Sequence, residues 1–205
     1  MKIIGISGLG GSGKDLSKEY IADKLSHHGK VETLRMAQPL KEACGLWFGW
    51  DVDRLTNDRH YKESSLLDNG QIDPICEMLG MNRREVMQRL GTECMRNGMH
   101  NDFWIILVKF GIMNGSYDGK YGIIPDCRFL NELRICDYTI RINGDTSITG
   151  PSHISEQEWG EWDNWSVVIE NHIDKSVSMN ENKKRLFEKL DVVVNEILDM
   201  DLIDA

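Results

Sequence analysis

The chain of 205 residues lacks a long hydrophobic run. No segment approaches about 18 consecutive apolar residues, so we expect no membrane span. The N-terminus has no basic region followed by an apolar stretch and a cleavage site, so no secretion signal is expected. Both absences predict a soluble, cytoplasmic protein.

Cysteine is sparse, and its spacing is typical of a reduced protein. The five cysteines are odd in number, and none stands in a C-x-x-C pair. This pattern argues against a disulfide framework or a zinc ribbon. We expect reduced thiols at Cys44, Cys76, Cys94, Cys127 and Cys136.

Positive charge is also in short supply. The chain has 24 Lys and Arg against 33 Asp and Glu, a net charge of −9. A protein that binds duplex nucleic acid usually carries a basic stripe, so no nucleic-acid partner is expected. A local basic pocket for a small anion remains compatible with this total.

What the sequence does contain is an alternation of short apolar strands and amphipathic helices. This alternation predicts one α/β domain with a parallel sheet of about five strands and helices on both faces. Residues 51–82 are polar and aperiodic, so we expect an irregular insertion or flap there. The expected strands cover residues 2–7, 31–35, 121–126, 138–143 and 165–171. The expected helices cover residues 15–28, 39–47, 83–96, 103–113 and 180–198, with a short one between the third and fourth strands.

A glycine-rich loop, GLGGSGK (8–14), lies directly between the first expected strand and helix. In that context the G-x-x-x-x-G-K pattern predicts a P-loop, whose backbone N–H groups and helix N-terminus bind phosphates. Lys14 can reach the β- and γ-phosphate oxygens of ATP, and the alternative is a flexible turn with a solvated lysine. The expected ATP-binding residues are Gly10, Gly11, Ser12, Gly13, Lys14, Asp15 and Leu16.

Asp15 follows the loop lysine where the usual pattern has serine or threonine. A carboxylate can bind the Mg²⁺ that accompanies ATP, directly or through water, because Mg²⁺ prefers oxygen ligands. The same side chain could instead cap the first helix. Both interpretations stay open, since one residue can do both.

A second group of polar residues suits an acceptor that carries a phosphate, which a phosphotransferase must hold facing the loop. Part of it follows the third strand, at the edge where open α/β sheets bind ligands. On the helix at 83–96, side chains four residues apart share a face. The candidates are Lys41, Arg84 with Gln88, Thr92 with Arg96, Trp104, Asp126 and Arg128.

Each candidate also has a structural interpretation. Exposed arginines usually form solvated ion pairs, apolar runs are usually core, and a carboxylate before a helix often caps it. The alternatives are solvated pairs for Arg84 and Arg96, core packing for Trp104, a cap for Asp126 and a pair with Glu132 for Arg128.

At these residues the sequence resembles the deoxynucleoside monophosphate kinases of tailed bacteriophages. The similar segments follow the family's order over residues 3 to about 190, and only residues 51–82 lack a clear counterpart. They are SGLGGSGKD, MAQPLK, REVMQRLGTE, NDFWIILV, IIPDCRFLNE, HISE and VVIEN. In that family an aspartate follows the loop lysine, so the resemblance implies a working loop of the G-K-D kind.

The resemblance implies a P-loop kinase fold and transfer of the ATP γ-phosphate to a deoxynucleoside 5′-monophosphate. Lys14, Arg128 and Arg84 would be catalytic, with Mg²⁺ held by Asp15 and Asp126. Residues 145–165, which include HISE, would form a lid-like segment in which His153 has no catalytic role, and the chain would form a homodimer. The acceptor would contact Lys41, Arg84, Gln88, Gly91, Thr92, Trp104, Asp126, Arg128 and Glu132.

Two other functions remain open. Phosphomevalonate kinases of the animal type have a similar G-K-D loop and an A-x-P-L-K-like segment, although LGTE and IIPDCRFLNE favour a nucleotide acceptor. A switch or binding module that hydrolyses ATP without an acceptor would also carry a P-loop. Such a module needs a residue that positions water, which the sequence does not locate.

Overall fold

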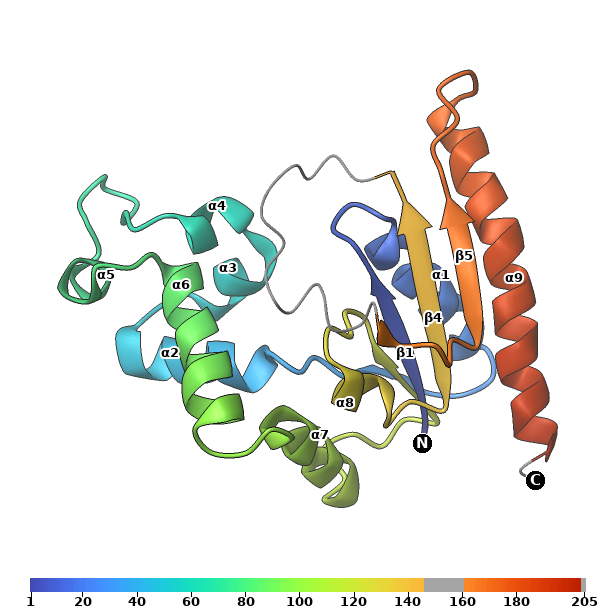
Figure 1. Cartoon of the computed structure of the whole chain (residues 1–205), viewed down its shortest axis with the longest axis horizontal. Helices are drawn as coiled ribbons and strands as arrows, with labels where there is room; N and C mark the ends of the chain where they lie inside the picture. Colours follow the sequence, from blue (N-terminus) through green and yellow to red (C-terminus); the bar gives the residue numbers. More distant parts are fainter. Residues whose placement is uncertain (146–160, 204–205) are drawn as a thin grey trace. The chain divides into compact units, whose positions relative to one another are not determined.

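Five strands form one parallel sheet in the computed structural model, which describes residues 1–145 and 161–203 (Figure 1). Neighbouring strands pair in the order β2-β3-β1-β4-β5. The prediction of an α/β fold with a five-stranded parallel sheet is confirmed. The strands are β1 (Lys2–Gly8), β2 (Val31–Thr33), β3 (Tyr121–Ile124), β4 (Tyr138–Gly144) and β5 (Val167–Asn171). β2 therefore ends before residue 35, and β5 begins after residue 165.

Two long helices cover one face of the sheet, α1 (Lys14–Ser26) and α9 (Met179–Ile203). Ile4 and Ile6 of β1 are fully buried in the apolar cluster that these helices complete. The two helices also contact each other, because the ring of Tyr20 stacks on that of Phe187 at 4.2 Å between centroids. This face therefore supplies the main core of the sheet.

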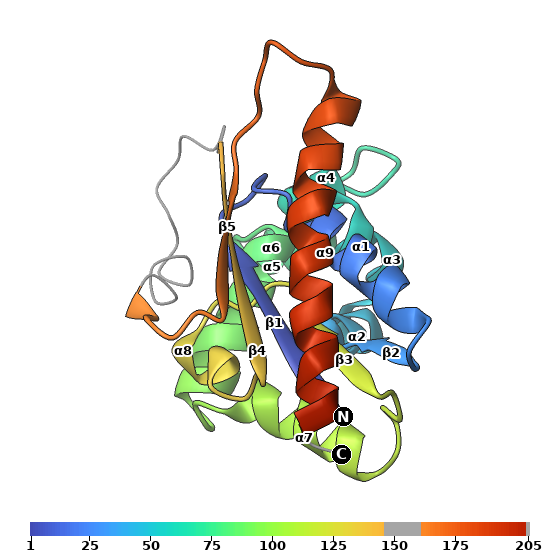
Figure 2. The same ribbon diagram turned by 90° about the vertical axis from the view of Figure 1, so that its right-hand side faces the viewer.

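The opposite face carries the segment that follows β3. Figure 2 shows the short helix α8 (Leu130–Leu133) on the other side of the sheet from α9. A Cβ added to Gly5 would project to this side and would lie 2.6 Å from Sγ of Cys136 and 3.0 Å from Sγ of Cys127. Side chains therefore alternate between the two faces along β1, as expected for a buried strand.

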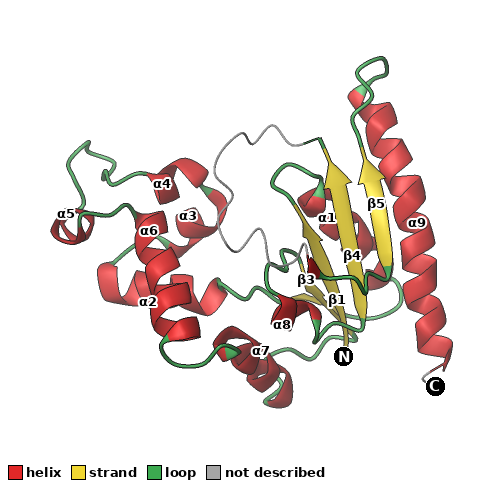
Figure 3. Cartoon of the chain, in the orientation of Figure 1, coloured by secondary structure: helices red, strands yellow, loops and turns green. Residues whose placement is uncertain are grey.

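The chain divides into two units. The first comprises Met1–Leu34 and Gly111–Ala205 and contains the sheet, and the second comprises Arg35–Phe110. Figure 3 shows the second unit as helices joined by loops. Its helices are α2 (Gln38–Phe48), α3 (Val52–Asn57), α4 (Arg59–Glu63), α5 (Pro74–Leu79), α6 (Arg83–Gln88), the π-helix η1 (Arg89–Asn97) and α7 (Phe103–Met113), which runs on into the first unit. Within residues 1–145 and 161–203, no helix is long and apolar enough to cross a bilayer.

One expectation about the second unit is wrong, and another holds only in part. Residues 51–82 are not irregular, since they contain α3, α4 and α5, each begun by an aspartate whose side chain accepts a backbone N–H. These helices have only five or six residues, too few to show a period. The single helix expected at 83–96 is α6 followed by η1, whose wider turn changes which residues share a face. The capping residues are Asp51, Asp58 and Asp73.

Candidate functional site

The glycine-rich loop joins the end of β1 to the start of α1 in the first unit. Gly13 is the N-cap of α1, and its φ of 102° is a left-handed conformation that favours glycine. The first N–H groups of a helix have no intrahelical partner, and the helix dipole adds partial positive charge there. The loop and helix thus have the strand–loop–helix geometry of a P-loop, which binds phosphate groups.

Two residues at neighbouring strand ends position the loop. Asn171 of β5 donates from Nδ2 to the carbonyl oxygen of Ser12 at 2.8 Å. Gly144 of β4 approaches the loop so closely that an added Cβ would lie 2.8 Å from Cα of Ser12. Sequence reasoning gave neither residue a role. The available signal was an asparagine and a glycine at the ends of two expected strands.

The hydroxyl of Ser12 is buried, and none of the described residues gives it a hydrogen-bond partner. A buried hydroxyl without a partner costs free energy, which a ligand oxygen would offset. On the same loop, an added Cβ on Gly11 would meet no atom within 4 Å. The loop therefore fits a ligand rich in oxygen acceptors, such as a polyphosphate.

The side chain of Lys14 lies along the loop, with 13% of its area exposed. Its Nζ donates to the carbonyl oxygens of Gly8 at 2.6 Å and Leu9 at 3.0 Å. The same Nζ lies 3.6 Å from Oδ1 of Asp126, in the segment after β3. The structure thus brings together two of the residues that the sequence singled out.

The segment after β3 also brings Asp126 and Arg128 together. Oδ2 of Asp126 accepts a hydrogen bond from Nε of Arg128 at 2.7 Å, so one carboxylate contacts both Arg128 and the loop lysine. Asp126 does not cap α8, because the N-cap of that helix is Phe129. Buried Glu132, expected in the acceptor site, instead accepts the backbone N–H of Arg128 at 2.8 Å and that of Phe129 at 3.3 Å.

Asp15 is exposed in the first turn of α1 and does not cap it, because Gly13 is the N-cap and no side chain caps that end. The capping interpretation of Asp15 is therefore wrong. Across residues 1–145 and 161–203, no group of three or more His, Cys, Asp or Glu side chains could hold a metal ion. Mg²⁺ bound with a nucleotide needs only one or two carboxylates, and Asp15 and Asp126 are of that type.

In the second unit, Lys41 of α2 is half-buried among other cations. Its Nζ lies 3.4 Å from Oγ1 of Thr56. Burial, followed by the positive charges of Lys62 and Arg35, lowers the pKa of Lys41 to about 8. An ammonium in these surroundings gains a partner when an anion binds.

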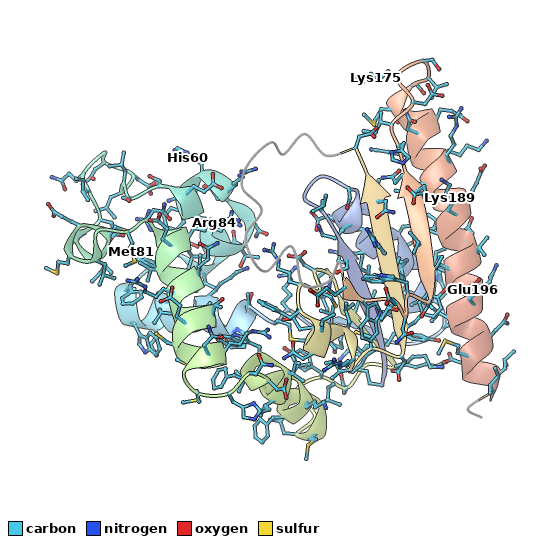
Figure 4. All side chains as sticks on the ribbon, viewed as in Figure 1. His60, Met81, Arg84, Lys175, Lys189 and Glu196 are labelled. Atoms are coloured by element: carbon cyan, nitrogen blue, oxygen red, sulfur yellow. The ribbon has the colours of Figure 1, made fainter. Side chains whose placement is uncertain are left out.

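Arg84 and Gln88 lie one turn apart on α6 and are only partly buried (Arg84 is labelled in Figure 4). Nη1 of Arg84 lies 3.3 Å from Oε1 of Glu63, and 41% of the arginine side chain is exposed, so the expected solvated pair is present. Thr92 and Arg96 lie in η1 and do not share a surface, because Arg96 is only 5% exposed. The solvated interpretation of Arg96 is therefore wrong.

Trp104 and Gly91 pack against each other inside the second unit. Nε1 of Trp104 donates to the carbonyl oxygen of Gly91 at 3.0 Å, and the indole is 8% exposed. An added Cβ on Gly91 would lie 2.9 Å from Cδ2 of Leu40. The core interpretation of Trp104 therefore holds, and neither residue offers a surface to a nucleoside.

The expected lid-like segment lies mostly outside the described residues, as do HISE and His153. Asp145, at its start, is described. Its Oδ1 lies 2.9 Å from Nδ1 of His172, and its Oδ2 accepts the backbone N–H of Ile173 at 2.8 Å. The hydrogen bond to Asp145 raises the pKa of His172.

No protein-family model matches the chain. The chain is 25% identical over 185 residues to a protein of Acanthamoeba polyphaga mimivirus named "Putative deoxynucleotide monophosphate kinase". This match covers 84% of the chain and 89% of the viral protein. Among solved structures, this chain is similar to a "putative plasmid partition protein" from Borrelia burgdorferi B31 bound to AMPPNP. That likeness has a TM-score of 0.40 and 15% identity, over 92% of this chain and 98% of the other.

Proposed function

We propose that the chain is a kinase that transfers the γ-phosphate of ATP to a deoxynucleoside 5′-monophosphate, giving ADP and the diphosphate. The observation that carries the proposal is the P-loop with Lys14 3.6 Å from Asp126, which in turn binds Arg128 at 2.7 Å. The similarity to the mimivirus protein, whose name states this activity, supports the acceptor class.

On the donor side, the loop amides and Lys14 hold the β- and γ-phosphates, and the hydroxyl of Ser12 gains an acceptor. Phosphoryl transfer passes through a loose transition state whose negative charge is spread over the transferring oxygens. Positioned cations therefore carry most of the catalysis. We assign this role to Lys14 and Arg128.

On the acceptor side, Lys41 and Arg84 contribute cations for the phosphate of the deoxynucleotide. Gln88 and Thr92 are partly exposed and can contact the nucleoside. Trp104 and Gly91 bind each other inside the second unit, and Glu132 holds the backbone of the segment that carries Arg128. Their effect on the acceptor is therefore indirect.

Mg²⁺ is proposed to accompany ATP and to neutralise charge on its phosphates, with Asp15 and Asp126 as the protein's oxygen ligands. Asp15→Asn should raise the Mg²⁺ concentration at half-maximal rate about tenfold. Because Gly13 caps α1, this substitution should leave stability unchanged. Asp23→Asn, farther along the same helix, is the control. An unchanged Mg²⁺ titration in Asp15→Asn would remove Asp15 from the metal site.

One assay tests the proposed function. ADP release would be followed by a coupled enzyme reaction with each of the four deoxynucleoside monophosphates, with phosphomevalonate, and with no acceptor. We expect turnover that depends on at least one deoxynucleotide and that disappears in Lys14→Ala. Turnover only with phosphomevalonate would move the protein to the other kinase class. Equal release without any acceptor would make it an ATPase.

A further inference from the structure

Two lysines from different helices converge on one threonine in the second unit. Nζ of Lys41, on α2, lies 3.4 Å from Oγ1 of Thr56, and Nζ of Lys62, on α4, lies 3.3 Å from the carbonyl oxygen of the same residue. Thr56 lies on α3, so three separate helices bring these groups together. Its hydroxyl already donates to the carbonyl oxygen of Val52 at 2.9 Å, which leaves the oxygen to accept from Lys41.

The surroundings of the two ammonium groups are strongly positive. Burial, and then Lys62 and Arg35, lower the pKa of Lys41 to about 8. Burial, and then Arg84, lower the pKa of Lys62. Partly buried like charges repel each other, and a single anion placed among them removes that repulsion.

The nearby carboxylates are engaged with other cations. Glu63 binds Arg59 at 3.0 Å and Arg84 at 3.3 Å. Asp58 caps α4 and lies 3.6 Å from Arg54. Both carboxylates act on Lys62 and raise its pKa, but burial and Arg84 outweigh them.

We propose that Lys41, Lys62 and Thr56 form the centre of a binding site for a phosphate monoester dianion, with Arg35 and Arg84 at its edge. The proposal rests on the proposed function, in which this group is the 5′-phosphate of the acceptor. It adds Lys62 and Thr56, which lie in short helices without a motif, and Arg35, which lies directly before MAQPLK; the sequence did not single out these three residues. An ammonium has three donors, so each lysine can bind a phosphate oxygen without leaving Thr56.

The first test measures binding without ATP or Mg²⁺. Calorimetry would compare each deoxynucleoside 5′-monophosphate and inorganic phosphate with the matching nucleosides. We expect the monophosphates to bind at least tenfold more tightly than the nucleosides, and Lys62→Met to weaken monophosphate binding at least tenfold. Lys109→Met, an exposed position on α7, should bind normally. Wild-type affinity in Lys62→Met, or no binding of any monophosphate, would overturn the site.

The second test uses pH, which a purely structural role of the lysines would not affect. The second pKa of a phosphate monoester is about 6, so the ligand stays a dianion from pH 7 to 9.5. Affinity should fall above pH 8, as Lys41 loses its proton, and Lys41→Met should abolish this fall. In Lys62→Met the fall should move to higher pH, because the charge of Lys62 helps to lower the pKa of Lys41. The same pH profile in all three proteins would overturn the site.

These results separate the site from the proposed function. If the chain is not a kinase of this type, monophosphates still bind in a manner that depends on Lys62, while no deoxynucleotide stimulates ADP release. If the site is wrong and the function right, Lys62→Met keeps the normal KM for the acceptor. The midpoint temperature of thermal unfolding of Lys62→Met should equal or exceed that of the wild type, since the substitution removes a repulsion between like charges.

Discussion

At the scale of single residues, the carboxylate of Asp126 in the first unit contacts two cations. Asp126 lies 3.6 Å from Lys14 and accepts a hydrogen bond from Arg128 at 2.7 Å. Its negative charge therefore holds two cations near the P-loop without a ligand to neutralise them. When a polyphosphate binds, its oxygens can replace this carboxylate as the partner of each cation. The geometry makes both cations candidates for contact with the transferring group.

Lys14→Ala should lower kcat at least about 10²-fold, because the ammonium acts mainly on the charge of the transferring phosphate. The fold should survive, since the contacts of Lys14 with the loop are two hydrogen bonds to carbonyl oxygens. Steady-state kinetics and circular dichroism measure the two effects. Lys18→Ala, one turn later on α1, is the control. Near-normal kcat in folded Lys14→Ala would contradict the P-loop assignment.

Arg128→Lys should reduce kcat/KM for the acceptor about 30- to 1000-fold, because a lysine cannot reproduce the planar fork that binds the transferring phosphate. ATP affinity measured without acceptor should change little. The control is Arg134→Lys, an exposed arginine at the end of α8. If Arg128 serves only an ion pair with a neighbouring carboxylate, the change should stay within about threefold. Kinetics with varied acceptor at saturating ATP decide between these outcomes.

At the scale of elements, a buried ion pair holds the short helices of the second unit. Nη2 of the fully buried Arg83 lies 2.7 Å from Oδ2 of Asp73, which also accepts a hydrogen bond from Nε1 of Trp50 at 2.9 Å. Nη1 of the same arginine donates to the carbonyl oxygens of Ser64 at 3.0 Å and Leu66 at 3.2 Å. The side chain of Arg83 thus binds both ends of the segment between α4 and α5.

Arg83→Met should lower the free energy of unfolding by about 3–5 kcal/mol, because it leaves the carboxylate of Asp73 buried without its cation. Arg84→Met, at the next position, should change it by less than about 1 kcal/mol, since the pair with Glu63 is exposed. Urea unfolding measures both. The order should be the opposite for activity: if Arg84 contacts the acceptor, Arg84→Met should lower kcat/KM for the acceptor more than Arg83→Met does. Equal stability of the two variants would contradict the structural role of Arg83.

These elements mark how far the sequence can predict the structure. The strand–loop–helix of the P-loop is local, so its glycines and Lys14 suffice to predict it. The helices α3 to α5 are too short to show a period, and Arg83, which lies outside them, binds Asp73 at the N-cap of α5 and the carbonyl oxygens that follow α4. Adjacent arginines look alike in a sequence, yet Arg83 is fully buried and the side chain of Arg84 is 41% exposed. Asn171 acts on the loop from 159 residues away, a distance no local pattern spans.

At the scale of the whole molecule, the chain leaves the first unit once and returns to it. It passes from β2 through the helical second unit, Arg35–Phe110, and re-enters the sheet at β3. The P-loop belongs to the first unit, and the cluster of Lys41, Lys62 and Thr56 belongs to the second. The proposed donor and acceptor phosphates are thus held by parts of the chain with separate cores.

This division predicts that the two ligands protect different amides from hydrogen exchange. A ligand at 100 times its Kd stabilises the region that it binds by about 2.7 kcal/mol, which slows exchange through opening of that region about 100-fold. AMPPNP with Mg²⁺ should slow exchange in β1 and the first turns of α1, and a bound deoxynucleoside monophosphate should slow it in α2 to α4. Lys62→Met should abolish the second effect and leave the first unchanged. Protection by the monophosphate confined to β1 and α1 would place the acceptor on the first unit and contradict the assignment.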